Sequence, residues 1–280
     1  MLLDALLGSL GSFRNRVVVV TGASSGIGRE TALLFARLGA RVALVARRRA
    51  LLEAAAADVR AAGGRPLVVP ADVGEARAAR AAVARIRRAW SRIDVLVNNA
   101  GVLKLAPVAQ IKAGDLDAML RVNLYGALFM MQAALPSMLG RRGRSIVNVA
   151  SLAGRRGLTP LGGYCATKFA LVGLTEALRT EVESKGLHVG LVLPGVVDTP
   201  MVQGIGPAET LPDWPAELNM PPDWVAAAIA LTVRFRLREV AVPPGAALIE
   251  ELGALMPGAS DALIGWMTAA GRLLARVRGS

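Results

Sequence analysis

The sequence predicts an α/β fold built on a doubly wound parallel sheet. Short runs of β-branched residues alternate with longer segments rich in alanine and leucine along most of the 280 residues. The short runs are continuously apolar rather than alternating, which is typical of strands that helices cover on both faces. Hydrophobic residues make up 54% of the chain, enough for one large core. In this architecture ligands bind at the carboxyl ends of the strands.

The elements follow one another in a regular order, each strand being a valine-, isoleucine- or leucine-rich run and each helix a longer alanine-rich segment. Gly39 ends the first helix. We expect strands at 16–20, 41–46, 66–70, 93–98, 144–150 and 187–193. We expect helices at 27–38, 49–62, 75–90, 116–139 and 163–185.

The pattern indicates a single domain with an added segment at each end. An apolar segment covers 1–13, the α/β domain covers 14–244, and a C-terminal helical extension covers 245–280. Seven prolines between residues 194 and 222 preclude a continuous helix there. We therefore expect a long loop or lid at 196–223, near the strand ends, where the substrate is chosen. The extension reads as two helical pieces separated by Pro257 and Gly258.

The net charge of +12 comes almost entirely from arginine, since the chain has only four lysines. One interpretation is a compositional habit; the other is a basic surface that attracts phosphorylated cofactors or anionic lipid head groups. A nucleic-acid partner is not expected, because no long basic run with interleaved aromatic residues occurs. Cys165 is the only cysteine, so no intramolecular disulfide can form, and a cytoplasmic location fits. No uncharged apolar stretch is long enough to predict a membrane-spanning helix.

A glycine-rich turn joins the first strand to the first helix and reads Thr-Gly-Ala-Ser-Ser-Gly-Ile-Gly at 21–28. Gly22 permits a tight turn, Gly26 lets backbone amides approach a pyrophosphate, and Gly28 lets the helix pack closely on the strand. The helix N-terminus adds unpaired N–H groups for the phosphates. The alternative is a plain strand–helix connection, but the strand–turn–helix context favours a Rossmann-type dinucleotide site.

Arginines stand at the end of the second strand, where a dinucleotide fold reads the adenosine ribose. An acidic residue there would repel a 2′-phosphate, but the chain has Arg47, Arg48 and Arg49 instead. Guanidinium groups suit a phosphate monoester, so NADP(H) is favoured over NAD(H). We expect Arg47 to be the main contact, with Arg48 in reserve and Arg49 on a solvated face. The alternative is that all three solvate the start of the next helix.

Tyr164 and Lys168 lie four residues apart on a predicted helix, so their side chains share one face. A tyrosine has an ordinary pKa near ~10, and a neighbouring ammonium group lowers that pKa towards a useful value. The phenol can then act as a general acid or base. Ser151 follows an apolar strand and can hydrogen-bond a substrate oxygen in the same cleft.

Taken in order, these motifs resemble the short-chain dehydrogenase/reductase family over roughly residues 14 to 200. The resemblance rests on the glycine turn, D-V at 72–73, N-N-A-G at 98–101, Asn123, Ser151, Y-C-A-T-K at 164–168 and P-G at 194–195. It implies that Tyr164, Lys168, Ser151 and Asn123 are catalytic, with Asn123 placing a water near Lys168. For Asn123 the alternative is a polar residue inside a helix that bonds backbone groups.

The resemblance also implies the residues that contact NADP(H), with Asp72 and Val73 flanking the adenine and Lys168 holding the nicotinamide ribose. For Asp72 the alternative is helix N-capping. The implied cofactor contacts are Gly22, Ser24, Ser25, Gly26, Ile27, Gly28, Arg47, Arg48, Asp72, Val73, Asn98, Ala100, Gly101, Tyr164, Lys168, Pro194, Gly195, Val197 and Thr199. No metal site is expected, because His188 is the only histidine and no Cys/His cluster surrounds it. Cys165 is expected to pack rather than react.

The C-terminal extension departs from the family pattern, in which a glycine-rich last strand closes the chain. Apolar residues at spacings of three and four predict an amphipathic helix between 261 and 278. Such a helix packs in the core or at a subunit interface, or it gives peripheral contact with a membrane. We expect a homo-oligomer, a dimer or a tetramer.

The sequence thus predicts an oxidoreductase that transfers hydride between NADP(H) and a carbonyl or secondary alcohol, reducing an apolar ketone or aldehyde. The alternatives are a dinucleotide-binding scaffold without turnover and a protein associated with a membrane surface.

Overall fold

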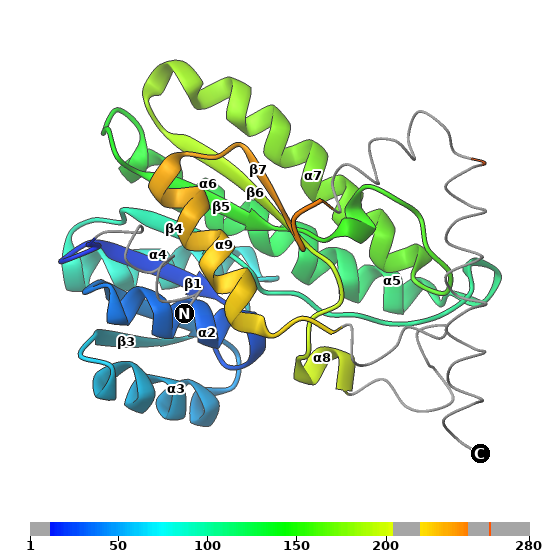
Figure 1. Ribbon diagram of the computed structural model, residues 1–280, viewed down its shortest axis with the longest axis horizontal. Helices are drawn as coiled ribbons and strands as arrows, with labels where there is room; N and C mark the ends of the chain where they lie inside the picture. The colour runs from blue at the N-terminus through cyan, green and yellow to red at the C-terminus, as the bar shows by residue number, and fades with distance from the viewer. Residues whose placement is uncertain (1–11, 204–218, 246–257, 259–280) are drawn as a thin grey trace.

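The computed structural model describes residues 12–203, 219–245 and 258, and these residues form a seven-stranded parallel sheet with helices on both faces (Figure 1). The strand order is β3-β2-β1-β4-β5-β6-β7, and all neighbours are parallel. The predicted doubly wound parallel sheet is therefore confirmed. The strands are β1 (Val17–Thr21), β2 (Arg41–Ala46), β3 (Arg65–Pro70), β4 (Val95–Asn98), β5 (Ser145–Val149), β6 (His188–Pro194) and β7 (Glu239–Val242).

The helices fall into two layers, because successive side chains of each buried strand point to opposite faces. Val18 and Val20 of β1 belong to one core cluster, whereas Val17 and Val19 belong to the other. The first layer contains α2 (Gly26–Arg37), α3 (Arg49–Ala61) and α9 (Pro222–Phe235). The second layer contains α4 (Ala76–Trp90), α6 (Gly126–Met138) and α7 (Gly162–Val182).

Short helical segments complete the described chain. They are α5 (Ala113–Leu120), the π-helical turn η2 (Arg121–Tyr125), α8 (Pro200–Gln203) and the 3-10 turns η1 (Val108–Gln110), η3 (Leu152–Gly154) and η4 (Glu183–Lys185). The strand order reverses direction between β1 and β4, which places the switch point of the sheet beside the glycine turn. In Figure 1, α8 follows β6 at the right of the view and marks the carboxyl edge of the sheet.

Three differences from the predicted elements concern helices. The helix expected at 116–139 starts earlier, at Ala113, and contains the π-helical turn around Asn123. Helix α9 was not expected at all, because it follows directly on the proline-rich segment. Pro222 is its first residue, a position where the missing N–H group costs no hydrogen bond. The segment expected as a loop also contains the short helix α8.

Helices α5 and α6 and the turn between them form one helical run, Ala113–Met138, which is long and apolar enough to cross a membrane by length and composition. Met130, Met131 and Met138 on this run are buried against the sheet. The run is thus a core helix of the second layer among the residues that the structure describes.

Arg155, after η3, ties the last strand to the second layer. Its Nη2 atom lies 2.8 Å from Oε1 of Glu176 on α7 and 2.6 Å from Oε2 of Glu239 on β7. The edge strand β7 is therefore fixed to the helix that carries Tyr164.

Several predictions lie outside the described residues. They concern the apolar segment up to residue 11, the part of the expected loop at 204–218, and the helical extension beyond Gly245.

Candidate active site

The glycine turn between β1 and α2 has the backbone conformation that its sequence predicts. Gly22 has a φ of +69° and Gly26 a φ of +50°, which side chains on L residues rarely permit. A Cβ atom on Gly28 would lie 2.3 Å from the carbonyl oxygen of Gly22, so α2 can approach the turn only through a glycine. A Cβ atom on Gly26 would lie 3.0 Å from Cγ2 of Thr199, which brings that predicted contact to the turn.

Asn99 holds the glycine turn through hydrogen bonds to Thr21, a role that was not predicted from the sequence. Its Nδ2 donates to the carbonyl oxygen of Thr21 at 3.0 Å. The backbone N–H groups of Asn99 and Ala100 both donate to Thr21 Oγ1, at 2.9 and 3.0 Å. The signal was present in the Asn98-Asn99 pair, because consecutive residues at a strand end point to opposite faces and only one can reach the turn.

The side chain of Asn98 points to the opposite face of the sheet, towards Asn148. It therefore does not line the cleft, contrary to expectation. It is 4% exposed and donates from Nδ2 to Asn148 Oδ1 at 2.8 Å. Asn148 in turn donates to Thr175 Oγ1 at 2.8 Å. These three side chains form a buried polar chain that joins β4, β5 and α7.

The arginines after β2 divide between two partners. Nη2 of Arg48 lies 3.2 Å from Ser24 Oγ and 3.3 Å from Ser25 Oγ, so this guanidinium group sits over the glycine turn. Arg47 instead faces Asp72, with 3.8 Å between Nη1 and Oδ2. The geometry thus places Arg48, expected only as a reserve contact, closest to the turn.

Asp72 and Val73 have structural contacts of their own. Asp72 Oδ1 accepts from the backbone N–H of Gly74 at 2.9 Å and shapes the turn before α4, whose N-cap is Glu75. Asp72 is therefore not the N-cap of that helix. Val73 is 5% exposed, and its side chain packs against Gly126, where an added Cβ atom would lie 2.9 Å from it. Its side chain therefore belongs to the core.

Ser151, Tyr164 and Lys168 meet at the carboxyl end of β5. Ser151 Oγ donates to the carbonyl oxygen of Pro194 at 3.2 Å and accepts from the N–H of Ala153 at 3.1 Å. A side-chain hydrogen bond also links Ser151 to Tyr164. Lys168 Nζ lies 5.6 Å from the centre of the Tyr164 ring and donates to the carbonyl oxygen of Val149 at 3.0 Å.

Burial controls the protonation of this group. It raises the pKa of Tyr164 to about 12, and the interaction with Ser151 offsets only part of that rise. Burial also lowers the pKa of Lys168 to about 8. The net shift of the Tyr164 pKa is therefore opposite to the expected one, because desolvation outweighs any lowering by Lys168.

Asn123 lies in the π-helical turn and is 1% exposed. Its Oδ1 accepts from the N–H of Val102 at 2.8 Å, and its Nδ2 donates to the Val102 carbonyl and to Thr167 Oγ1, both at 3.0 Å. The side chain thus bonds backbone, as the alternative interpretation expected. It holds the segment after β4 against the helix turn that carries Lys168.

The segment after β6 borders the same site. Gly195 donates from its backbone N–H to the carbonyl oxygen of Val242 at 2.8 Å. Val197 is buried and forms a bridge with Met220. This pairing holds the chain after Pro194 in place, with Thr199 against the glycine turn.

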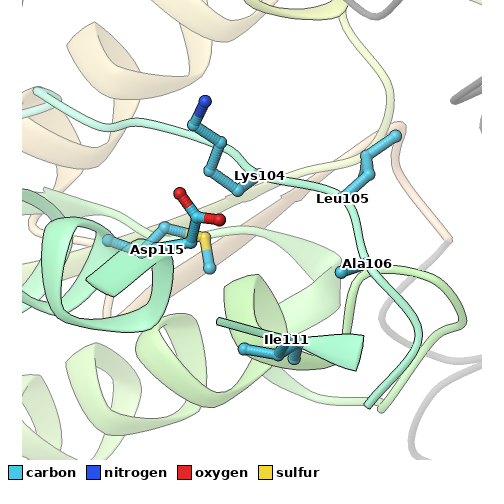
Figure 2. A pocket seen from close by; sticks show the side chains of 6 residues that line it. Lys104, Leu105, Ala106, Ile111 and Asp115 are labelled. Atoms are coloured by element: carbon cyan, nitrogen blue, oxygen red, sulfur yellow. The ribbon is translucent and has the colours of Figure 1, made fainter. Parts of the chain in front are cut away.

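A pocket of about 130 Å³ lies beside the first turn of α7. Met119 and Ile111 form part of its lining and also approach Gly163, the residue before Tyr164, where a Cβ would lie 2.8 and 3.3 Å from them. Figure 2 shows the charged ends of Lys104 and Asp115 at one side of the pocket and Ile111 at the other.

Comparison with known proteins agrees with this geometry. A sorbitol dehydrogenase from Cereibacter sphaeroides is 40% identical over 184 residues, which cover 65% of this chain and 71% of the relative. A short chain dehydrogenase from Burkholderia cenocepacia in complex with NADP has a TM-score of 0.75 at 31% identity, covering 85% of this chain and 100% of its own. A Burkholderia phymatum short chain dehydrogenase/reductase in complex with NAD has a TM-score of 0.77 at 25% identity, covering 86% and 93%.

The family model described as short chain dehydrogenase matches residues 16–210. This range holds the glycine turn, Ser151, Tyr164 and Lys168. The chain therefore belongs to the short-chain dehydrogenase family.

Proposed function

We propose that this protein is an NADP(H)-dependent oxidoreductase that transfers hydride between the nicotinamide and a carbonyl or secondary alcohol carbon. The observation that carries the proposal is the meeting of Ser151, Tyr164 and Lys168 at the carboxyl end of β5, with Lys168 Nζ 5.6 Å from the centre of the Tyr164 ring. All three follow the carboxyl end of β5, and the glycine turn follows the carboxyl end of β1 in the same parallel sheet. A proton donor and a dinucleotide cradle thus share one edge of the sheet.

The residues present fit a dinucleotide. The positive φ angles of Gly22 and Gly26, and the close approach of α2 to the turn that Gly28 permits, form a backbone cradle at the start of α2. Gly22, Gly26 and Gly28 would hold the pyrophosphate, Arg48 with Arg47 the 2′-phosphate, and Lys168 the nicotinamide ribose. Bound NADPH supplies the hydride. The chain supplies orientation, charge and a proton.

Tyr164 delivers that proton from its phenolic oxygen to the substrate oxygen. Ser151 Oγ donates a hydrogen bond to the same oxygen and so stabilises the negative charge that develops on it. The ammonium group of Lys168 favours the phenolate that Tyr164 becomes. In the oxidation direction each group takes the reverse role, because a general acid acts as the base when the reaction runs backwards.

Reduction is the direction that the buried phenol favours. With a pKa of about 12, Tyr164 is protonated throughout the neutral range and is ready to donate. Oxidation requires the phenolate, so its rate should rise with pH.

An apolar substrate is part of the proposal. A Cβ atom on Gly195 would lie 3.3 Å from Leu152 and 3.4 Å from Met220. A Cβ atom on Gly101 would lie 3.8 Å from Met201. Gly195 follows Pro194, whose carbonyl oxygen accepts from Ser151 Oγ, so Leu152 and Met220 lie near the proposed place of the substrate oxygen. The sorbitol dehydrogenase relative is named for a polyol, so a substrate panel should contain polyols beside aliphatic and aromatic ketones and aldehydes.

Absorbance of the nicotinamide ring in that panel tests the proposal directly, with Tyr164→Phe as the critical variant. The variant removes the transferable proton and keeps the ring, so kcat should fall by at least about a hundredfold, while NADPH still binds with similar affinity by fluorescence titration. A Tyr164→Phe enzyme with near-normal kcat on its best substrate would show that the mechanism is wrong.

We also propose that the protein is a homo-oligomer that associates through the outer face of η2, α6 and α7. Tyr125 is 47% exposed and stacks on Phe129 with ring centres 6.0 Å apart. Phe169 on the neighbouring α7 is 45% exposed. Large aromatic side chains exposed on adjacent helices are typical of a subunit interface.

A further inference from the structure

The edge of the sheet opposite the active site carries a concentration of arginine. Nine arginines lie at the start of a strand or within the three residues before it: Arg14, Arg16, Arg41, Arg65, Arg92, Arg142, Arg144, Arg236 and Arg238. Because all seven strands are parallel, their starts lie along a single edge. We call it the arginine edge.

Few acidic groups balance this charge. Asp94 accepts from the N–H of Val17 at 2.8 Å and is already shared by Arg92, at 2.9 Å, and Arg144, at 3.8 Å. The exposed carboxylates Glu181 and Glu183 follow at the end of α7, beside Lys185. Positive charge is therefore in excess among the described residues of this edge.

The cations also lie close enough to affect one another. Burial lowers the pKa of Arg16, opposed by Asp94 and reinforced by Arg92 and Arg234. Arg234 is on α9, so this interaction joins the start of β1 to the turn between α9 and β7.

That turn presents apolar and basic side chains in strict alternation. Its sequence, Arg-Phe-Arg-Leu-Arg at 234–238, is exposed at every position. Phe235 is 53% exposed and Leu237 is 38% exposed. Large apolar side chains exposed two residues apart and flanked by arginines are typical of a binding surface.

The backbone of the turn is nevertheless fixed. The N–H of Leu237 donates to the Thr232 carbonyl at 3.1 Å, and the Leu237 carbonyl lies 2.9 Å from Nε2 of His188. Arg179 donates to the carbonyl oxygen of Arg238 at 2.8 Å. The backbone of the turn is therefore held in place, and binding would cost little backbone ordering.

The described chain also begins at this edge. The N–H of Phe13 donates to the carbonyl of Leu38, at the end of α2, at 2.8 Å, and the Arg16 guanidinium lies 5.1 Å from the Phe13 ring centre. The first described residues therefore lie beside the arginines at the start of β1.

We propose that the arginine edge binds the surface of a lipid bilayer with anionic head groups. Phe235 and Leu237 enter the boundary of the acyl region, and Arg234, Arg236 and Arg238 contact the head-group phosphates. A combination of basic and apolar side chains binds such a surface better than either alone. The exposed Leu237 favours a bilayer over nucleic acid, since an aliphatic side chain does not stack on bases. The active site then faces the water. This inference is independent of the proposed function.

Co-sedimentation of the full chain with vesicles tests the proposal. We expect binding to phosphatidylcholine vesicles that contain phosphatidylglycerol, little binding to phosphatidylcholine alone, and weaker binding as salt is added. The variant Phe235→Ser with Leu237→Ser should lower the partition coefficient by at least about tenfold, because each side chain buries apolar area. The matched control is Leu51→Ser, since Leu51 is 40% exposed on α3, near the other edge.

A second pair of variants tests the charge. Arg236→Gln with Arg238→Gln should weaken binding to the anionic vesicles, whereas Arg77→Gln with Arg80→Gln on α4 removes the same charge elsewhere and should not. Equal loss in the two pairs would overturn the proposal, as would unchanged binding in the Phe235 and Leu237 variant. Binding of the full chain to a DNA duplex in fluorescence polarisation, without binding to vesicles, would overturn it as well.

Discussion

At the scale of single residues, the active site combines two groups, Tyr164 and Lys168, whose burial disfavours their charged forms. Lys168 is 4% exposed, and its ammonium group has a carbonyl oxygen as its hydrogen-bond partner rather than a carboxylate. Tyr164 is held in its neutral form by the same desolvation. Such a pair costs stability and is retained at a site where a proton must move.

The cost of Lys168 predicts a pH-dependent stability. Burial lowers its pKa from 10.5 to about 8 in the folded chain. Between these values the unfolded chain binds more protons, so the free energy of unfolding rises with pH from about 8 to 10.5. Lys168→Met should lack this rise and gain stability at pH 7, on the order of 3 kcal/mol. Urea unfolding of both proteins across that range measures it, and parallel curves would contradict it.

Cofactor preference should depend on Arg48. Its position on Ser24 and Ser25 places it nearest the turn. Arg48→Ser should raise KM for NADPH by about tenfold or more, the loss of a charge-assisted contact, and leave KM for NADH nearly unchanged. Arg47→Ser measures the other candidate. Arg49→Ser is the control, because Arg49 faces Glu53 at 4.0 Å on α3. An equal loss with both nucleotides would remove Arg48 from this role.

At the scale of elements, the strands and the glycine turn followed from sequence because local rules determine them. Continuous valine runs made β1 recognisable, and three glycines in a strand–turn–helix context placed the cradle. The unexpected features depend on contacts between distant segments. Asn98 and Asn99 have the same chemistry. Because successive side chains of a strand point to opposite faces, one bonds Asn148 and the other bonds the glycine turn. Whether Arg47 or Arg48 reaches the serines depends on Asp72, which lies on another loop.

Strand β6 opens with the one histidine, and this predicts acid sensitivity. Burial lowers the pKa of His188 from 6.5 to about 4, against the hydrogen bond to Leu237, with Arg236 and Arg179 lowering it further. The unfolded chain binds more protons between these values, so stability present above pH 6.5 is lost as the pH falls towards 4. His188→Gln should flatten this window. Urea midpoints at pH 7.5 and pH 5 for both proteins check it, and an equal drop would contradict it.

At the scale of the whole molecule, the parallel sheet separates two kinds of surface. The carboxyl edge holds the site, the opposite edge holds the arginines, and the outer helices of the second layer expose aromatic side chains. Each surface therefore has its own proposed partner. The carboxyl edge binds a nucleotide and a carbonyl, the arginine edge binds a bilayer, and the outer helices bind a second copy of the chain.

The oligomer prediction belongs to this scale. Phe169→Glu puts a charge at the centre of the proposed interface and should raise the dissociation constant of the oligomer by at least about a hundredfold, because burying an unpaired carboxylate is costly. Light scattering after size-exclusion chromatography measures the mass of both proteins. Leu51→Glu is the control on a distant helix. A Phe169→Glu protein of unchanged mass, or a wild-type monomer, would contradict the prediction.

The buried chain from Asn98 through Asn148 to Thr175 has a consequence for the exchange of amide protons with solvent. It bonds β4, β5 and α7 together at the centre of the sheet, with no exposed member. Opening any one of these elements leaves polar groups of the other two unpaired in the core. The backbone amides of β4 and β5 therefore exchange only when the whole domain unfolds. Their protection reports the global free energy of unfolding, while the edge strands β3 and β7 open separately and exchange sooner.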